Sequence, residues 1–310
     1  MSRVSDISIV IPTFNRLWAL PQAVESCRST GIRTEIVVVD DGSTDGTWDW
    51  LQAQRDIVAI RTDNWGKDWA VETALAAATG EYVRFLDSDD WLSEDANADQ
   101  LALAREKAAD IVVAGYEDYD EESGERRVNA WDDCDDFIAQ QLGEGWASHY
   151  SAFLFRRDLI RGIPHRQDFA LRDDRLFILE VAMRHPRLAV YRKPAFVHRR
   201  HAGDRLQHTS GFKRDLRYWM HISIYRKVLG LLEQRGELTS RRKQAAIQTL
   251  WPNVRSFARA YPREAAEVVD WIYSLDPGFV PPVRPALALA YRLLGFATTE
   301  RLLRFRSLPQ

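Results

Sequence analysis

Several features that would point to other classes of protein are scarce or absent in this sequence of 310 residues. It has two cysteines, Cys27 and Cys134, which are too few for a disulfide framework or a structural zinc site. No apolar run approaches the roughly 20 residues needed to cross a bilayer, and the N-terminus lacks a signal-peptide pattern. The net charge of −3 argues against a general nucleic-acid binder. We therefore expect a soluble, cytoplasmic protein.

Both common glycine-rich nucleotide motifs are also missing. The sequence contains neither Gly-x-Gly-x-x-Gly nor Gly-x-x-x-x-Gly-Lys, which argues against dinucleotide and P-loop binding. Hydrophobic residues make up 45% of the chain, enough for the sizeable core of one large domain or two smaller ones.

The first hundred residues alternate apolar strands with helices. Strands are predicted at 7–11, 35–39, 57–61, 82–86 and 110–115, with helical patterns between most of them. Strands separated by helices of about ten residues form right-handed β-α-β units and a parallel sheet. In such sheets, ligands bind at the carboxyl ends of the strands.

Three of these strand ends carry side chains with useful chemistry. Phe14 follows the first strand, Asp41 follows the second, and the sequence Asp-Ser-Asp-Asp at 87–90 follows the fourth. Together they offer an aromatic ring, a carboxylate that accepts hydrogen bonds from a base or ribose, and acidic ligands for Mg²⁺ or Mn²⁺. This combination predicts a nucleotide-diphosphate site. Taken alone, the acidic turn is equally well explained as a solvated cap of the next helix.

Three segments resemble the inverting family-2 glycosyltransferases. They are VIPTFN at 10–15, VVVDDGSTD at 37–45 and GEYVRFLDSDD at 80–90. The resemblance is dense over residues 5–115, thinner to about 206 and faint beyond. It implies an α/β fold of the GT-A type, with a Rossmann-like, mostly parallel sheet flanked by helices and a helical C-terminal extension.

The same resemblance assigns the donor and metal residues. It implies Mn²⁺ or Mg²⁺ bound by Asp89, with Asp87 facing the donor or the metal and His201 as a third ligand. The residues expected to bind the donor are Pro12, Phe14, Asp41, Asp87, Ser88 and Arg199. The phosphate clamp is expected to be Arg199 or Arg200. Lys67, just after the turn, is expected to be a surface lysine, with a phosphate contact as the alternative. Val71-Glu72 depart from the Arg-Asn that the family often has.

A second acidic pair, Asp173-Asp174, precedes a helical pattern. Transfer of a sugar to a hydroxyl needs a group that removes the acceptor's proton. The resemblance places this catalytic role on Asp174, with Asp173 bonding the acceptor or the backbone. The alternative is a helix-capping pair. The acidic segment 117–136 is expected to be a hairpin or a solvated connection.

The last third of the chain is predicted to be helical, ending in short amphipathic helices at 286–294 and 300–305. Residues 277–310 hold five arginines and one acidic residue. An apolar face edged by arginines suits an anionic membrane surface, but also fits packing on the chain's own domain or on a dimer partner.

These observations predict a nucleotide-sugar-binding half at 1–116, an acceptor-binding and catalytic half of the same GT-A domain at 117–210, and a helical region at 211–310. The expected enzyme is a metal-dependent inverting glycosyltransferase that moves a sugar from a nucleotide-diphosphate donor to a hydroxyl of a glycan or glycolipid. Cell-surface polysaccharide biosynthesis is the expected role, and the expected location is the cytoplasm, with a peripheral position at the inner face of the membrane as the alternative. The alternatives are a non-catalytic nucleotide-sugar-binding or scaffold protein with a degenerate site, and a nucleotidyltransferase. The latter would be expected to have a Gly-rich loop after the first strand, which this chain lacks.

Overall fold

The computed structural model describes residues 5–28, 31–202, 211–258 and 260–306. The chain divides into two compact units. The first contains residues 1–133 and 146–205, and the second contains residues 134–145 and 206–310. The division expected from the sequence placed 134–145 in the acceptor half, whereas these residues pack with the C-terminal helices.

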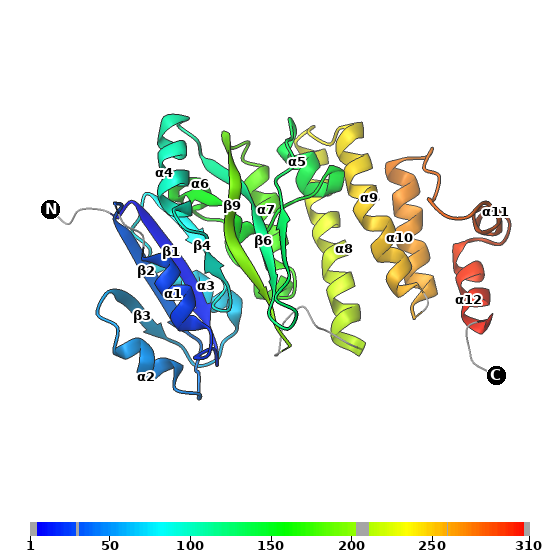
Figure 1. The fold of residues 1–310 in the computed structure, drawn as a ribbon. Coiled ribbons are helices and arrows are strands. Elements are labelled where there is room, and N and C mark those ends of the chain that lie inside the picture. The colour runs from blue at the N-terminus through cyan, green and yellow to red at the C-terminus, as the bar shows by residue number, and fades with distance from the viewer. Residues whose placement is uncertain (1–4, 29–30, 203–210, 259, 307–310) are drawn as a thin grey trace. The chain divides into compact units, whose positions relative to one another are not determined.

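The first unit is a nine-stranded sheet with helices packed against it (Figure 1). The strand order is β3-β2-β1-β4-β8-β6-β9-β5, and β7 pairs with β6. The strands are β1 (Ile7–Thr13), β2 (Thr34–Asp40), β3 (Ile57–Arg61), β4 (Tyr82–Phe85), β5 (Trp91–Leu92), β6 (Ile111–Asp120), β7 (Arg126–Asn129), β8 (Leu154–Arg156) and β9 (Leu188–Arg200). The helices are α1 (Leu20–Cys27), α2 (Thr47–Gln52), α3 (Lys67–Ala77), α4 (Ala96–Glu106), α6 (Arg157–Ile160) and α7 (Asp173–Ala182), with single 3-10 turns η2 (Tyr150–Ala152) and η3 (Gln167–Phe169).

The expected α/β architecture is confirmed, but the sheet is mixed. Strands β1 to β4 pair only in parallel with one another, as the β-α-β pattern predicts. Strand β8 lies between β4 and β6 and is antiparallel to both. The crossover through α4 therefore keeps β6 in the direction of β4, and β8 fills the space between them in the opposite direction.

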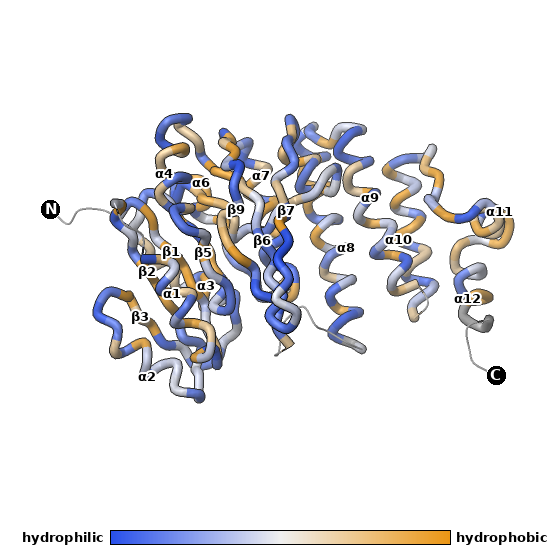
Figure 2. Tube along the Cα trace, in the orientation of Figure 1, coloured by the Kyte–Doolittle hydropathy of each residue, from blue (hydrophilic) through white to orange (hydrophobic). Residues whose placement is uncertain are grey.

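Burial explains why the first strands are so apolar. Every residue of β1 is buried, and helix α3 covers β1 and β2 with Ala70, Val71 and Ala74. The chain then passes from α3 to β4 through Gly80, where a Cβ atom would lie 2.5 Å from the backbone N of Ser8. Figure 2 shows the apolar strands at the centre of this unit. The core thus fixes where each strand ends.

Strand β6 is longer than predicted, since it runs to Asp120 rather than ending at residue 115. Strand β9 extends to Arg200, because it pairs with β6 and also with β5. His198 therefore lies within a strand. The acidic segment at 117–136 contributes to the β6–β7 hairpin, as one of the two expectations stated.

The regular elements that the structure describes in the second unit are all helical. They are α5 (Phe137–Ala139), the π-helical turn η1 (Gln140–Glu144), α8 (Gly211–Gln234), α9 (Ser240–Phe257), α10 (Pro262–Leu275), α11 (Pro285–Leu294) and α12 (Phe296–Arg306). Gly143 (φ 124°) lets η1 approach α9 closely, since a Cβ there would lie 2.0 Å from Oγ1 of Thr249. Among the helices that the structure describes, none has the length and apolar character of a membrane span.

Candidate active site

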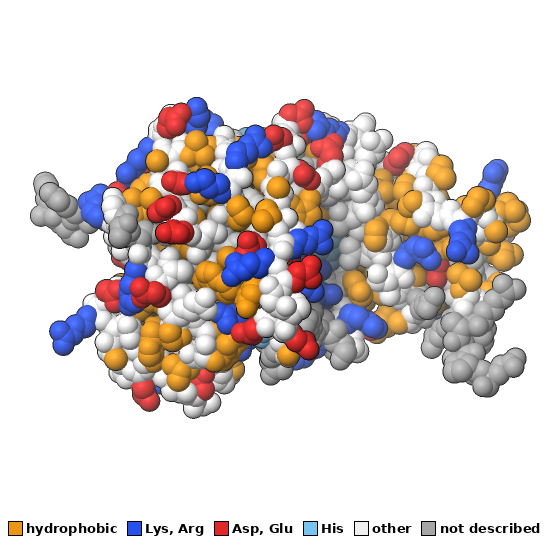
Figure 3. Space-filling model, in the orientation of Figure 1, with side chains coloured by type: hydrophobic (Ala, Val, Ile, Leu, Met, Phe, Trp, Pro, Cys, Tyr) orange, Lys and Arg blue, Asp and Glu red, His pale blue; other side chains and the backbone are white. Residues whose placement is uncertain are grey.

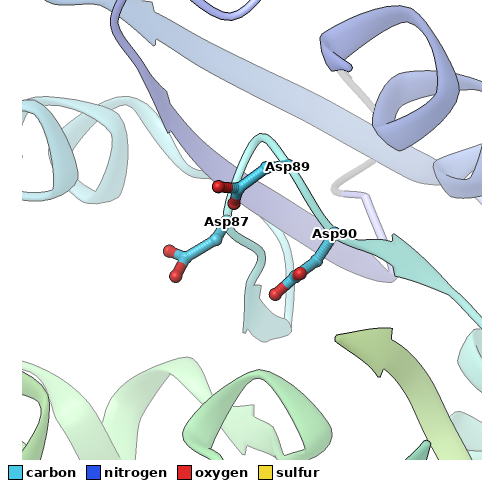
Figure 4. A group of neighbouring side chains, drawn as sticks. All are labelled: Asp87, Asp89 and Asp90. Carbon is cyan, nitrogen blue, oxygen red and sulfur yellow. The ribbon is translucent and has the colours of Figure 1, made fainter. Parts of the chain in front are cut away.

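The turn between β4 and β5 gathers three carboxylates. Asp87, Asp89 and Asp90 each place one oxygen within 4.8 Å of the others (Figure 4). The turn is fixed at its start by the bond from the backbone N of Leu86 to the carbonyl of Val10, 3.0 Å, and Asp90 closes it with an N–H to the carbonyl of Asp87, 3.1 Å. The predicted acidic turn is thus a preformed cluster at the sheet edge.

Asp90 is the carboxylate that sequence reasoning left without a role. It is 2% exposed, and its Oδ1 accepts a hydrogen bond of 2.9 Å from the backbone N of Arg199. Its Oδ2 is buried and has no hydrogen-bond partner in the described part of the chain. Burial, followed by the charges of Asp87 and Asp89, raises the pKa of Asp90 well above its usual range. A buried oxygen without a donor, inside an acidic cluster, fits a divalent cation.

Asp89 and His201 lie together, although 112 positions separate them. His201 Nε2 is 3.1 Å from Asp89 Oδ2, and Arg16 Nε is 3.6 Å from the same oxygen. The imidazole is buried and meets the ring of Trp18 edge-on at 4.8 Å. The structure therefore brings together two of the three residues expected to ligate a metal, and the third, Asp87, lies in the same cluster.

Lys67 differs from the surface residue expected. It is the first residue of α3, and its Nζ lies 2.6 Å from Asp87 Oδ1. Burial is the largest single effect and opposes the charge of Lys67, but Asp87, Tyr150 and Asp174 together outweigh it and raise the pKa of Lys67 well above its ordinary value. Burial likewise opposes the charge of Asp87, and Lys67 lowers the pKa of that carboxyl. The lysine thus supplies positive charge at the edge of the acidic cluster.

The donor residues expected at the ends of β1 and β2 occupy one interlocked edge. Phe14 follows β1 and is 41% exposed, while Pro12 is buried inside the strand and Ser88 is buried in the acidic turn. Asn15 (φ 51°) ties the two strand ends together, with its N donating to Ser43 Oγ and its Oδ1 accepting from Thr44 N, both at 2.8 Å.

Asp41 holds the turn that follows β3. Its Oδ1 accepts hydrogen bonds of 2.8 Å from Thr62 Oγ1 and from the backbone N of Trp65. Its Oδ2 accepts 2.7 Å from the backbone N of Gly66. The carboxylate expected to contact the nucleotide's base is therefore fixed in orientation. It also holds the turn that leads into α3.

The second acidic pair begins α7, and its two members differ sharply in exposure. Asp173 is 4% exposed, accepts a hydrogen bond of 2.5 Å from Arg166 N and contacts Nδ1 of His165. Asp174 is exposed and accepts 2.8 Å from the backbone N of Arg175. The structure thus gives Asp173 a bond to the backbone and leaves Asp174 open to solvent.

Asp174 also acts electrostatically on the first turn of α3. Its negative charge is one of the contributions that raise the pKa of Lys67. Burial, followed by the charge of Asp173, raises the pKa of Asp68 to about 7, and Asp174 adds to that effect. The two acidic centres, separate in the sequence, therefore belong to one charged site.

Glu72 connects these two centres structurally. Its Oε1 accepts a hydrogen bond from the backbone N of His165, which in turn contacts Asp173. The glutamate, which departs from the family pattern, thus ties α3 to the segment in front of Asp173 and Asp174. Neighbouring Val71 is buried in the core.

Arg199 is 8% exposed and surrounded by partners. Its guanidinium lies 4.9 Å from the ring centre of Trp91 and 5.4 Å from that of Trp18, with Nη1 3.0 Å from Glu121 Oε1. Arg200, the other candidate clamp, is exposed.

Two histidines near the cluster make hydrogen bonds of their own. His149 Nδ1 accepts 3.3 Å from Ser151 N, and burial lowers the pKa of His149. Its ring stacks at 6.0 Å on His198, whose Nδ1 is 2.9 Å from Asp118 Oδ1.

Comparison with known protein families identifies the family of this chain. The family described as glycosyl transferase family 2 matches residues 8–164, just over half of the chain. The chain belongs to glycosyltransferase family 2. The matched region contains the acidic turn, the ends of β1 and β2, and Lys67.

One curated family-2 relative is the glycosyltransferase GlyG of Streptococcus pneumoniae serotype 4. It is 32% identical over 162 residues, which cover 48% of this chain and 54% of GlyG. The chain therefore spans about half the length of this relative.

Two solved structures share the fold. Staphylococcus aureus TarS 1–349 in complex with UDP-GlcNAc superposes with a TM-score of 0.67 at 18% identity, covering 98% of this chain and 93% of TarS. The mannosyltransferase PcManGT of Pyrobaculum calidifontis, in complex with GDP-Man and Mn²⁺, gives a TM-score of 0.51 at 18% identity, covering 98% and 88%. The GT-A fold implied by the sequence motifs is thus confirmed.

Proposed function

We propose that this family-2 protein is a metal-dependent inverting glycosyltransferase that moves a sugar from a nucleotide-diphosphate sugar to a hydroxyl of a glycan or glycolipid. The observation that carries this proposal is the acidic cluster of Asp87, Asp89 and Asp90 at the sheet edge, with His201 3.1 Å from Asp89. The complexes of TarS with UDP-GlcNAc and of PcManGT with GDP-Man and Mn²⁺ support it. TarS carries the name poly(ribitol-phosphate) β-N-acetylglucosaminyltransferase, which supports a role in cell-surface polysaccharide biosynthesis.

The residues that would hold the cation are Asp89, Asp87 and His201, with Asp90 available through its free oxygen. Mn²⁺ or Mg²⁺ bound there would neutralise the charge on the departing diphosphate. Lys67 adds a second positive charge beside Asp87. Because Arg199 is enclosed by Trp18 and Trp91, we assign the phosphate contact to the exposed Arg200 and a positioning role to Arg199.

The donor's base and ribose would bind along the ends of β1 and β2. Phe14 offers an exposed ring, and Asp41 a carboxylate already held in place by three donors. Pro12 and Ser88 shape the floor of this region with buried side chains. A fixed edge of this kind binds a nucleotide without reorganising the protein.

The chemical step is a single displacement with inversion. The acceptor's hydroxyl oxygen forms a bond to the anomeric carbon as the bond from that carbon to the diphosphate oxygen breaks, and the electron pair leaves with the nucleoside diphosphate. Asp174 takes the hydroxyl proton on its carboxylate. Asp173 positions it, since its own carboxylate is committed to Arg166 and His165. Exposure of Asp174 lets an acceptor reach it.

The test is donor hydrolysis across a panel of nucleotide sugars with Mn²⁺. We expect slow release of nucleoside diphosphate from one donor, reduced at least ~100-fold in Asp89→Ala and Asp174→Asn. An Asp49→Asn variant, on the exposed side of α2, controls for a lost surface charge. Release that is unchanged in Asp89→Ala would contradict the proposal.

A thermal-shift measurement distinguishes an enzyme from a scaffold protein with a degenerate site. A catalytic donor site is stabilised by nucleoside diphosphate with Mn²⁺, because a ligand that binds only the folded state raises its stability. A scaffold with a degenerate site shows no shift.

We also propose that the C-terminal helices contact an anionic membrane surface, where a lipid-linked acceptor would be presented. On α11 and α12, Leu289, Leu293, Leu294 and Leu302 are 51 to 71% exposed. Exposed Arg284, Arg292 and Arg301 lie along the same segment. The one acidic residue of 277–310, Glu300, is buried and bonded to Tyr291. Figure 3 shows hydrophobic and basic side chains beside one another in the region of α11.

A further inference from the structure

Two tryptophans that flank Lys67 in the sequence are open to solvent. Trp65 is 55% exposed and Trp69 is 47% exposed. Their ring centres lie 6.4 Å apart with an angle of 73° between the planes. Burying a large apolar side chain is worth roughly 2 kcal/mol or more, so a folded protein rarely leaves two indoles outside its core. Such a pair next to a site indicates a surface that a ligand covers.

The pair is held rigidly by the site itself. The backbone N of Trp65 donates to Asp41, and its carbonyl accepts 2.7 Å from Nε2 of Gln167. Between the two indoles, Gly66 (φ 107°) makes the turn into α3, and Trp69 then stands in the first turn of that helix. Both rings are therefore presented on an ordered backbone, which lowers the entropic cost of binding.

The position of the pair links the donor side to the base. Lys67 lies between the two tryptophans in the chain and bonds Asp87 at 2.6 Å. Gln167 belongs to η3, shortly before Asp173 and Asp174. The chain segment that carries the indoles is thus bonded both to the acidic turn and to the segment before the proposed base.

We infer that Trp65 and Trp69 form a platform on which a pyranose ring of the acceptor stacks. This inference rests on the proposed function and adds to it a binding site for the acceptor. The C–H bonds on one face of a pyranose carry partial positive charge, and the face of an indole carries negative charge. Two indoles at a steep angle offer one face and one edge to a single ring, while the sugar's hydroxyls remain free for Asp174.

The experiment is ¹⁹F NMR of the full chain labelled with 5-fluorotryptophan. The resonances of Trp65 and Trp69 are assigned with Trp65→Phe and Trp69→Phe, and Trp271, in the second unit, serves as the internal control. The probes are methyl glycosides of glucose, galactose and N-acetylglucosamine and the disaccharides cellobiose and lactose, each titrated with and without UDP and Mn²⁺.

We expect saturable shifts of the Trp65 and Trp69 resonances with at least one glycoside and no shift of Trp271. The double variant Trp65→Ala/Trp69→Ala should bind that glycoside about tenfold more weakly by ligand-observed NMR, whereas Trp271→Phe binds it as the parent does. No shift with any probe up to ~100 mM, where even a Kd weaker than 1 mM gives occupancy, overturns the inference. Shifts produced only by UDP and Mn²⁺ also overturn it, since they assign the pair to the donor. This experiment measures binding and needs no turnover. A negative result here can therefore be told apart from a negative result in the donor-hydrolysis test.

Discussion

At the scale of single residues, the site holds several carboxylates close together and few positively charged side chains. Asp87 is paired with Lys67 and Asp89 with Arg16, and the His201 ring lies 3.1 Å from Asp89. Asp90 and Asp68 are left with raised pKa values. Charges arranged in this way cost stability and are typical of functional sites.

Asp68 gives a prediction about pH. It is 5% exposed and lies near Asp173, Lys67 and Asp174, and its pKa is raised from 3.8 to about 7. A raised carboxyl pKa contributes stability that is fully present below 3.8 and is lost as the pH rises through about 7. The full difference corresponds to about 4 kcal/mol. Asp68→Asn should therefore become more stable, relative to the parent, between pH 5 and pH 8.

The measurement is the Tm of both proteins at the two pH values. We expect a small difference at pH 5 and a gain of several degrees for Asp68→Asn at pH 8, with Asp49→Asn unchanged relative to the parent. Equal differences at pH 5 and pH 8 would show that Asp68 does not titrate in this range.

Arg84 gives a prediction about stability. It is fully buried in β4, where Nε donates 2.8 Å to Asn97 Oδ1, Nη1 donates 3.0 Å to the carbonyl of Ser151, and Nη2 contacts Gln100. Burial lowers the pKa of Arg84 to about 10. Because Arg84→Met leaves these acceptors without a donor, the free energy of unfolding should fall by at least ~3 kcal/mol.

Chemical denaturation measures this loss, and Arg161→Met, an exposed arginine paired with Asp158, is the matched control. A change below ~1 kcal/mol for Arg84→Met would mean that the buried bonds contribute little to stability.

At the scale of elements, the sequence predicts the parts of the sheet that are locally encoded. The four parallel strands are predicted from continuous apolar runs, and the acidic turn from a distinctive motif. His201 is predicted as a metal ligand through the family resemblance. The pairing of Lys67 with Asp87 and of Glu72 with His165 spans 20 and 93 positions. Both depend on where the first turns of α3 point, which no local pattern encodes. The apolar segment before Arg156 and Arg157 predicts a strand where β8 lies, but not its antiparallel direction, because that direction depends on the neighbouring strands.

The last helices give a prediction at this scale. If α11 and α12 contact anionic lipid, the chain should co-sediment with phosphatidylcholine vesicles containing 30% phosphatidylglycerol, and added salt should weaken binding. Leu289→Ser/Leu293→Ser should reduce partitioning about tenfold or more, because each serine removes exposed apolar surface from the face.

The matched control is Val128→Ser on β7, which removes an apolar side chain that is 57% exposed in the first unit. Equal binding of all variants, or equal binding to pure phosphatidylcholine, would contradict the assignment of this face to an anionic surface.

At the scale of the whole molecule, the chain leaves the first unit at residue 134, returns at 146 and leaves it again after 205. The sequence predicts a helical region from residue 211, and α8 begins at Gly211. It does not reveal that 134–145 packs with those later helices, because the contact of Gly143 with Thr249 joins residues distant in the chain. Long-range packing of this kind is settled by tertiary contacts rather than by propensity.

The central claim is that the acidic turn binds a divalent cation that joins the protein to a nucleoside diphosphate. Calorimetric titration of UDP and GDP, with and without Mn²⁺, tests it most directly. We predict that one of the two binds only with Mn²⁺, that Asp89→Asn loses this binding and that Asp49→Asn keeps it. Binding that is equally tight without the metal, or that survives in Asp89→Asn, would contradict the account.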